Sequence, residues 1–95
     1  MDQGAHRRRH RHARRARFCA TPATQTREIL RHLGSAYQVL GQYNKAIEHH
    51  TAALAISREI GDRRGEGTDL GNLGNAYNSL GQYDKAIEHY NQALA

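Results

Sequence analysis

The chain has few of the residues that cross-link or anchor a fold. Cys19 is its only cysteine, which rules out an intrachain disulfide or a cysteine-rich zinc site, so we expect a reducing, cytoplasmic compartment. No apolar run approaches the roughly 20 residues that a membrane span needs. Residues 18–20 are too short for the apolar core of a secretory signal. With one proline and apolar residues at helical spacing, the expected class is all-α.

Charge of one sign gathers at the N-terminal end. The formal net charge is +5, and residues 6–17 (HRRRHRHARRAR) hold seven of the fourteen basic residues. From residue 21 onward there are seven basic and eight acidic residues, which leaves −1. Dense like charge with few large apolar side chains predicts that residues 1–20 form a disordered basic tail. Residues 21–95 remain as the folding unit.

This second part of the chain repeats itself. Residues 33–55 align with residues 73–95 at a shift of 40, and 16 of the 23 positions are identical. A period between 20 and 50 residues is typical of a solenoid built from one helical unit per repeat. We place repeat one at about 27–60 and repeat two at about 67–95. Because the second repeat stops at the equivalent of Ala55 and no polar capping helix follows, we expect it to be truncated.

The spacing within each repeat is helical. Leu30, Leu33, Tyr37 and Leu40 fall at i, i+3, i+7 and i+10, and the same pattern recurs 40 residues later. We predict helices at 22–40, 43–60, 63–80 and 83–95, which form two antiparallel hairpins. The predicted start and stop signals are the N-caps Thr21 and Asp62 and the glycine caps Gly41, Gly61 and Gly81.

Two glycines interrupt the predicted first helices. Gly34 and Gly74 each cost about 1 kcal/mol relative to alanine in a helix interior. We therefore expect a neighbouring helix to approach closely there, with Ala46 and Ala86 at the matching place. A large residue at Gly74 is expected to push the two helices apart.

These residues resemble the tetratricopeptide repeat. The pattern is Leu-Gly-x-x-Tyr, then Gly-x-Tyr-x-x-Ala, then a large residue and an alanine. It falls on Leu33, Gly34, Tyr37, Gly41, Tyr43, Ala46, His50 and Ala53, and again on Leu73, Gly74, Tyr77, Gly81, Tyr83, Ala86, Tyr90 and Ala93. The 40-residue period is similar to the subclass of kinesin light chains, spindle-orientation adaptors and bacterial regulatory arrays. Its departures are the missing first-helix tryptophan and His50 at an aromatic position.

The resemblance implies an all-α fold, a tetratricopeptide-like (TPR-like) α-solenoid fragment of two antiparallel hairpins. It also implies a concave groove in which the first helices hold an extended peptide or a helix of a partner protein. The implied groove positions are Glu28, Arg31, His32, Ser35, Gln38 and Val39, followed by Thr68, Gly71, Asn72, Asn75, Asn78 and Ser79. An asparagine offers both a donor and an acceptor to a peptide backbone. The plainer interpretation is a solvated polar helix face.

Three hypotheses follow. In the first, the chain is a protein-binding module, a fragment of a longer scaffold or regulator. In the second, the basic tail binds an anion or nucleic acid; nucleic acid is disfavoured because no aromatic residue interrupts residues 6–17. The favoured interpretation of the tail is a nonfunctional extension, and an organellar presequence is the remaining alternative. In the third, the chain is a fragment without independent function, since Ile87, Tyr90 and Leu94 lack a covering repeat, unless two copies form a homodimer end to end.

Catalysis, cofactors and metals have little support. The histidines at positions 6, 10, 12, 49 and 50 lack the companion ligands of a zinc motif. The glycines at positions 65, 67, 71 and 74 lack the strand and the Lys-Ser/Thr pair of a phosphate loop. A two-hairpin solenoid has no closed cavity that excludes water. We therefore expect no enzyme, no cofactor and no metal.

Overall fold

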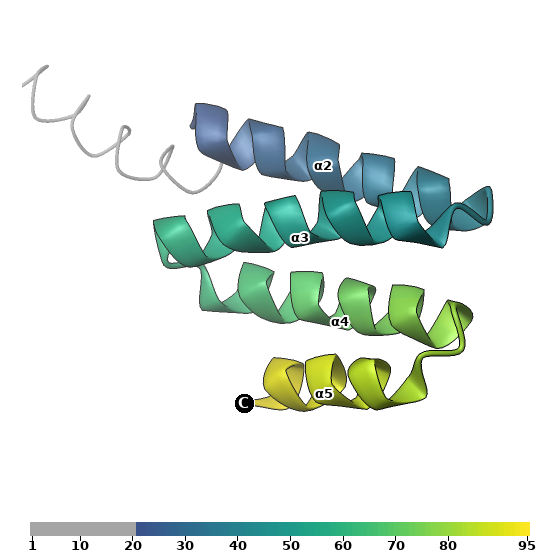
Figure 1. Ribbon diagram of the computed structural model, residues 1–95. Coiled ribbons are helices and arrows are strands. Elements are labelled where there is room, and N and C mark those ends of the chain that lie inside the picture. The colour runs from purple at the N-terminus through teal and green to yellow at the C-terminus, as the bar shows by residue number, and fades with distance from the viewer. Residues whose placement is uncertain (1–20) are drawn as a thin grey trace, which may run out of the picture.

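The computed structural model describes residues 21–95, which fold into four antiparallel helices (Figure 1). They are α2 (Pro22–Val39), α3 (Tyr43–Ile60), α4 (Arg63–Ser79) and α5 (Tyr83–Leu94). Each agrees with its predicted range to within one residue, and the predicted all-α fold of two helical hairpins is confirmed. No strand occurs within the described range.

The helix ends form where the local sequence predicts them. The Thr21 hydroxyl accepts a hydrogen bond from the Thr24 N–H (3.2 Å), and Asp62 Oδ1 accepts one from the Gly65 N–H (2.9 Å). Both bonds satisfy donors that a helix N-terminus leaves free. The three loops each turn on a glycine with a positive φ, namely 81° at Gly41, 73° at Gly61 and 80° at Gly81. The predicted caps are therefore confirmed.

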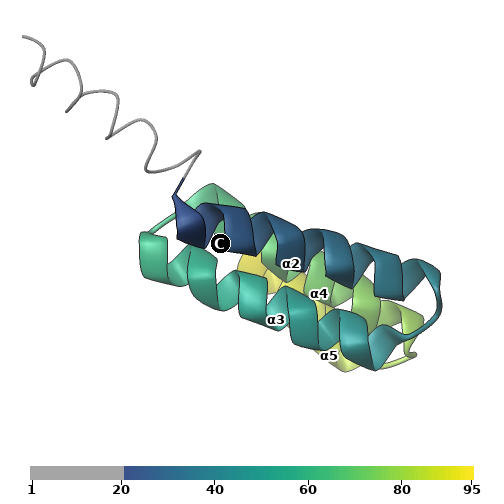
Figure 2. The same ribbon diagram turned by 90° about the horizontal axis from the view of Figure 1, so that it is seen from above.

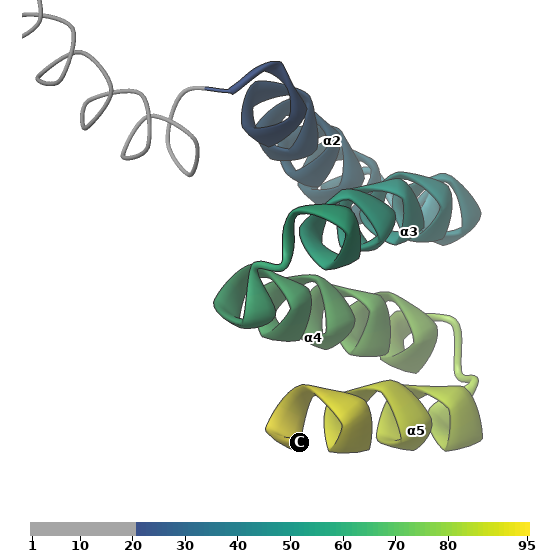
Figure 3. The same ribbon diagram turned by 90° about the vertical axis from the view of Figure 1, so that its left-hand side faces the viewer.

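Each helix packs mainly against the helix before it and the helix after it in the chain. Viewed from the end, α2 and α4 lie on one side of the array and α3 and α5 on the other (Figure 3). The view from above shows the same separation (Figure 2). The first helices of the two hairpins thus share one face, which is the arrangement that a groove between them requires.

The interior glycines make room for a side chain from the partner helix. A Cβ at Gly34 would lie 2.6 Å from the His50 imidazole, and a Cβ at Gly74 would lie 2.6 Å from the Tyr90 ring. The predicted close approach is confirmed, but the side chains that fill it come one turn after Ala46 and Ala86. Tyr90, expected to lack a covering repeat, thus has a packing partner within its own hairpin.

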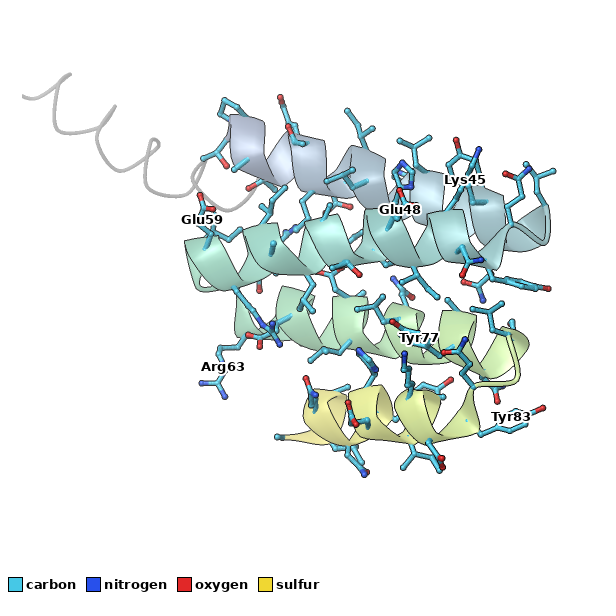
Figure 4. The ribbon with its side chains drawn as sticks, in the orientation of Figure 1. Lys45, Glu48, Glu59, Arg63, Tyr77 and Tyr83 are labelled. Carbon is cyan, nitrogen blue, oxygen red and sulfur yellow. The ribbon has the colours of Figure 1, made fainter. Side chains whose placement is uncertain are left out.

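Each hairpin also stacks a histidine on the tyrosine of its first helix. The ring centroids of Tyr77 and His89 lie 5.0 Å apart, and Lys85 Nζ lies 5.6 Å from the Tyr77 ring centroid. The His89 Nδ1–H donates to the Lys85 carbonyl (2.7 Å). The first hairpin repeats this stack with Tyr37, Lys45 and His49. Figure 4 labels Tyr77 and Lys45, one from each stack.

The apolar core lies at the junction between the hairpins, where α3 packs on α4. Leu54, Leu70 and Leu73 form its centre, and Ile47 and Tyr77 pack against them. Burying an aliphatic side chain of this size contributes roughly 1.5–3 kcal/mol. This junction is thus the principal apolar contact that joins the two repeats.

Candidate functional site

A cavity of about 440 Å³ opens on the face shared by α2 and α4. Its lining comes from Ser35, Gln38 and Val39 of α2, Asn72, Asn75 and Ser79 of α4, and Tyr43 of α3. The spacing of three or four residues places each set on one side of its helix. We call this cavity the α2–α4 groove. Apart from Val39 and Tyr43, its lining consists of uncharged polar side chains.

Six of the twelve predicted groove positions do not line this cavity, namely Glu28, Arg31, His32, Thr68, Gly71 and Asn78. Arg31 is bound to α4, as described below, and the Thr68 hydroxyl donates to the Arg64 carbonyl (3.2 Å). His32 and Asn78 are exposed on α2 and α4. The structure thus brings together Ser35, Gln38, Val39, Asn72, Asn75 and Ser79, and it adds Tyr43 to the lining.

Asn75 is positioned by the second helix of its own hairpin. Its Oδ1 accepts a hydrogen bond from the Tyr90 hydroxyl, while the Tyr90 ring packs over Gly74. With its oxygen held by Tyr90, the side-chain amide of Asn75 keeps its N–H groups as donors. The first hairpin has Ser35 and His50 at these two positions, so the groove has a different side chain at each repeat.

A buried ion pair ties the two helices that form the groove. Arg31 of α2 binds Asp69 of α4 through two bonds, Nε to Oδ1 (2.7 Å) and Nη2 to Oδ2 (3.3 Å). Asp69 is fully buried and also accepts from the Ser57 hydroxyl of α3 (2.6 Å). Arg31 Nη2 donates further to the Gly65 carbonyl (3.0 Å). The paired geometry and the additional bonds are what allow a charge to be buried here.

Arg27 extends this network toward the N-terminal ends of α2 and α4. It is buried, and its Nη1 donates to Ser57 Oγ (3.1 Å) and to Asp62 Oδ2 (2.8 Å). Gly65 leaves room for both arginines, since a Cβ there would lie 2.7 Å from Arg27 Nη1 and 2.9 Å from Arg31 Nη2. Together Arg27, Arg31, Ser57, Asp62 and Asp69 form what we call the arginine network.

The charges of the network shift two pKa values. The bond to the Gly65 N–H lowers the pKa of Asp62 below its ordinary value, and its bond and charge pairing with Arg27 act in the same direction, against partial burial. Burial by itself lowers the pKa of Arg31, but the bond and the charge of Asp69, with the charges of Glu28 and Asp62, outweigh burial and raise it. Both groups therefore stay charged at neutral pH.

His50 is a buried histidine of the first hairpin. Its side chain fills the space over Gly34, and its Nδ1 has no hydrogen-bond partner within residues 21–95. Burial lowers the pKa of His50, and the charges of His49 and Arg31 act in the same direction, whereas the charge of Asp69 opposes them. The neutral imidazole is thus the form that this site accommodates.

Sequence reasoning missed the arginine network, although the repeat contains its signal. Arg27 and Arg31 stand where the second repeat has Gly67 and Gly71, and Asp69 stands where the first repeat has Ile29. A charged residue that occurs at such a position in only one of the two repeats indicates a contact that forms once in the chain, between the repeats. Within the described range, no cluster of three or more His, Cys, Asp or Glu side chains is suited to hold a metal ion.

Two further predictions concern the chain outside this site. The basic tail, with Cys19 and the histidines at positions 6, 10 and 12, lies outside the described residues. Among residues 21–95, none of the helices is both long enough and apolar enough to span a bilayer.

Comparison with known proteins gives one finding. The family model described as "Tetratricopeptide repeat" matches residues 25–95, most of the chain. Neither the curated proteins nor the solved structures give a match.

Proposed function

Because the chain belongs to the tetratricopeptide repeat family, whose repeats are protein interaction modules and typically non-catalytic, we propose that it binds an extended peptide or helix of a partner protein in the α2–α4 groove. The observation that carries this proposal is the convergence of Ser35, Gln38, Asn72, Asn75 and Ser79, from two helices, on one open cavity. Such an arrangement suits a scaffold or regulator rather than an enzyme.

The lining indicates which part of a peptide is recognised. Hydroxyl and carboxamide groups offer donors and acceptors without net charge, as do the N–H and C=O groups of a peptide backbone. Val39 and Tyr43 add an apolar contact at the end of the groove. We therefore expect binding that depends on backbone contacts and on one apolar side chain, with little dependence on salt.

The width of the groove is set by the arginine network. Arg31 links α2 to α4 directly through Asp69 and the Gly65 carbonyl, and Arg27 reaches Asp62 at the N-cap of α4. A groove held at fixed width by a buried ion pair needs less reorganisation when a peptide enters, and this favours affinity. The network is thus a structural support for the proposed site and does not itself contact the peptide.

The test uses the full 95-residue chain and a displayed library of random peptides. Selected peptides are measured by fluorescence anisotropy against wild type, against Asn72→Ala/Asn75→Ala, and against the control Asn44→Ala/Asn91→Ala, whose asparagines are exposed on α3 and α5. Loss of about one net hydrogen bond per asparagine predicts roughly 10- to 100-fold weaker binding for the groove variant. The control is expected to bind as wild type does.

Equal affinity of the groove variant and the control would contradict the proposal. A steep fall in affinity with added salt would indicate instead the alternative function, anion or nucleic-acid binding by the basic tail. The 40-residue-period subclass and a cytoplasmic location stay predictions. A second copy of the chain, the other predicted partner, would use the apolar ends of the array and is separable from groove binding.

A further inference from the structure

The two ends of the helical array expose large apolar side chains. On α5, Leu94 is 87% exposed and Ile87 is 56% exposed. On α2, at the opposite end in Figure 1, Leu40 is 68% exposed and Leu33 is 39% exposed. Figure 4 shows that Tyr83, at the start of α5, also points away from the helices. Apolar surface of this kind, gathered on two opposite faces, indicates an interaction.

The interior junction shows what such faces bind. Where α3 packs on α4, Leu54 and Ile47 of α3 lie against Leu70 and Leu73 of α4. Leu54 is 6% exposed and Leu73 is 2% exposed, and Ala76 of α4 is fully buried. At this junction, an apolar surface on the second helix of one hairpin packs against an apolar surface on the first helix of the next hairpin.

Both halves of that junction recur, unpaired, at the ends of the same chain. Ile47 and Leu54 of α3 correspond, 40 positions later, to the identical residues Ile87 and Leu94 of α5. Leu70, Leu73 and Ala76 of α4 correspond, 40 positions earlier, to the identical residues Leu30, Leu33 and Ala36 of α2. The α5 end therefore carries the same apolar half as α3, and the α2 end carries the same apolar half as α4.

The charged residues of the interior junction do not recur at the ends. The position of the buried Asp69 is Ile29 on α2, and the position of Arg31 is Gly71 on α4. Burying an unpaired charge is costly. A junction formed from the α5 end and the α2 end buries neither of these charges, because the carboxylate and the guanidinium are absent together.

We propose that a second copy of this chain docks head to tail, with α5 of one copy on α2 of the next, in the geometry of α3 on α4. The contact is heterologous, since it joins two different surfaces, and it leaves one end of each kind free. Association therefore continues beyond the dimer as concentration rises. Each added copy extends the face on which α2 and α4 lie, so the grooves of successive copies line up.

Sedimentation equilibrium of the full chain over a range of concentrations tests this. We expect the weight-average mass to rise from 10.7 kDa through the dimer to larger species. Leu33→Glu breaks the α2 end and Ile87→Glu breaks the α5 end, so each variant alone is expected to be monomeric. Thr51→Glu, an exposed position on α3, is the control for the added charge and should assemble as wild type does.

The decisive sample is an equimolar mixture of the two variants. Leu33→Glu keeps a sound α5 end and Ile87→Glu keeps a sound α2 end, so the mixture forms one junction and stops at twice 10.7 kDa. A mixture that stays monomeric overturns the proposal, as does a wild type that is monomeric throughout. Association retained by Leu33→Glu alone or by Ile87→Glu alone also overturns it, because that result indicates symmetric pairing of identical ends.

Circular dichroism confirms that each variant is folded. If Leu33→Glu or Ile87→Glu loses helicity, Ile29→Glu and Leu94→Glu replace them, because both side chains are highly exposed and lie on the same two ends. The mixing experiment then applies unchanged. Neither pair alters a residue that lines the α2–α4 groove, so peptide binding by the monomeric variants is a separate measurement.

Discussion

The first hairpin carries Arg27, Arg31 and His50 at the positions where the second carries Gly67, Gly71 and Tyr90. The backbones of the two hairpins follow the same plan, and their tyrosine–histidine–lysine stacks agree in geometry. The few residues that differ decide what each hairpin does.

The first hairpin is specialised for holding the array together. Its two arginines reach across to Asp62 at the N-cap of α4 and to Asp69 further along α4. The second hairpin presents Asn75 to the groove and fixes it with Tyr90. The residues that the two repeats share form the helices and their packing, whereas the residues that differ determine which contacts each hairpin makes.

Removing Asp69 is expected to have the largest effect. Asp69→Ala leaves the partly buried guanidinium of Arg31 without its principal partner, and we expect a loss of about 3 kcal/mol of unfolding free energy. The measurement is urea unfolding followed by circular dichroism, with Glu88→Gln, an exposed carboxylate on α5, as the control.

A second variant replaces the ion pair between α2 and α4 with two apolar residues. In Arg31→Leu/Asp69→Ile both charges leave together, and isoleucine is the residue that the first repeat has at the corresponding position, Ile29. We expect this double variant to recover most of the stability that Asp69→Ala loses. A double variant as unstable as Asp69→Ala would show that the charge pairing is not the cause.

Two glycines of α4 should respond in opposite directions to alanine. In Gly74→Ala the new Cβ meets the Tyr90 ring at 2.6 Å, and we expect a net loss of up to about 2 kcal/mol after the gain in helix propensity. In Gly71→Ala the Cβ has nothing within 4 Å, and we expect a gain of about 1 kcal/mol. Thermal unfolding of both variants compares them; equal gains would refute the close-approach account.

His50 should make the first hairpin sensitive to pH. Because burial lowers its pKa in the folded chain, the unfolded chain takes up the proton more readily. Stability is then complete above the ordinary imidazole value of about 6.5 and decreases as the pH falls below it. We expect His50→Phe to remove this part of the pH dependence. The pH-dependent change in unfolding free energy that is lost is expected to be smaller than the effect of Gly74→Ala. Midpoints of thermal unfolding at neutral and mildly acidic pH measure it, and an unchanged pH profile would contradict this assignment.

The smallest effect is expected from Tyr90→Phe. The ring still fills the space over Gly74, but the hydroxyl that holds Asn75 is gone. One lost hydrogen bond of about 1 kcal/mol corresponds to roughly five-fold weaker peptide binding. Anisotropy with a selected peptide measures this change, and Tyr83→Phe, exposed at the start of α5, is the matched control. If the two variants bind alike, Tyr90 does not position Asn75 for binding.

The sequence alone predicted the helices and their ends, because these depend on local features. Thr21 and Asp62 cap the residues three positions later, and the apolar spacing is regular. The resemblance to the tetratricopeptide repeat also named six residues that line the α2–α4 groove, which are Ser35, Gln38, Val39, Asn72, Asn75 and Ser79. That they bind a peptide stays a prediction. The sequence alone did not reveal that Arg31 is bound to Asp69, or that Tyr90 holds Asn75, because those contacts join side chains 38 and 15 residues apart.

The α2–α4 groove is proposed to bind a peptide backbone. The most direct test is nuclear magnetic resonance of the isotope-labelled chain, titrated with a peptide selected from the library. If the peptide lies in this groove, the largest shifts are expected in the side-chain amides of Asn72 and Asn75 and in the backbone of Ser35 and Ser79. Shifts confined to residues 1–20, or to the outer surfaces of α3 and α5, would contradict it.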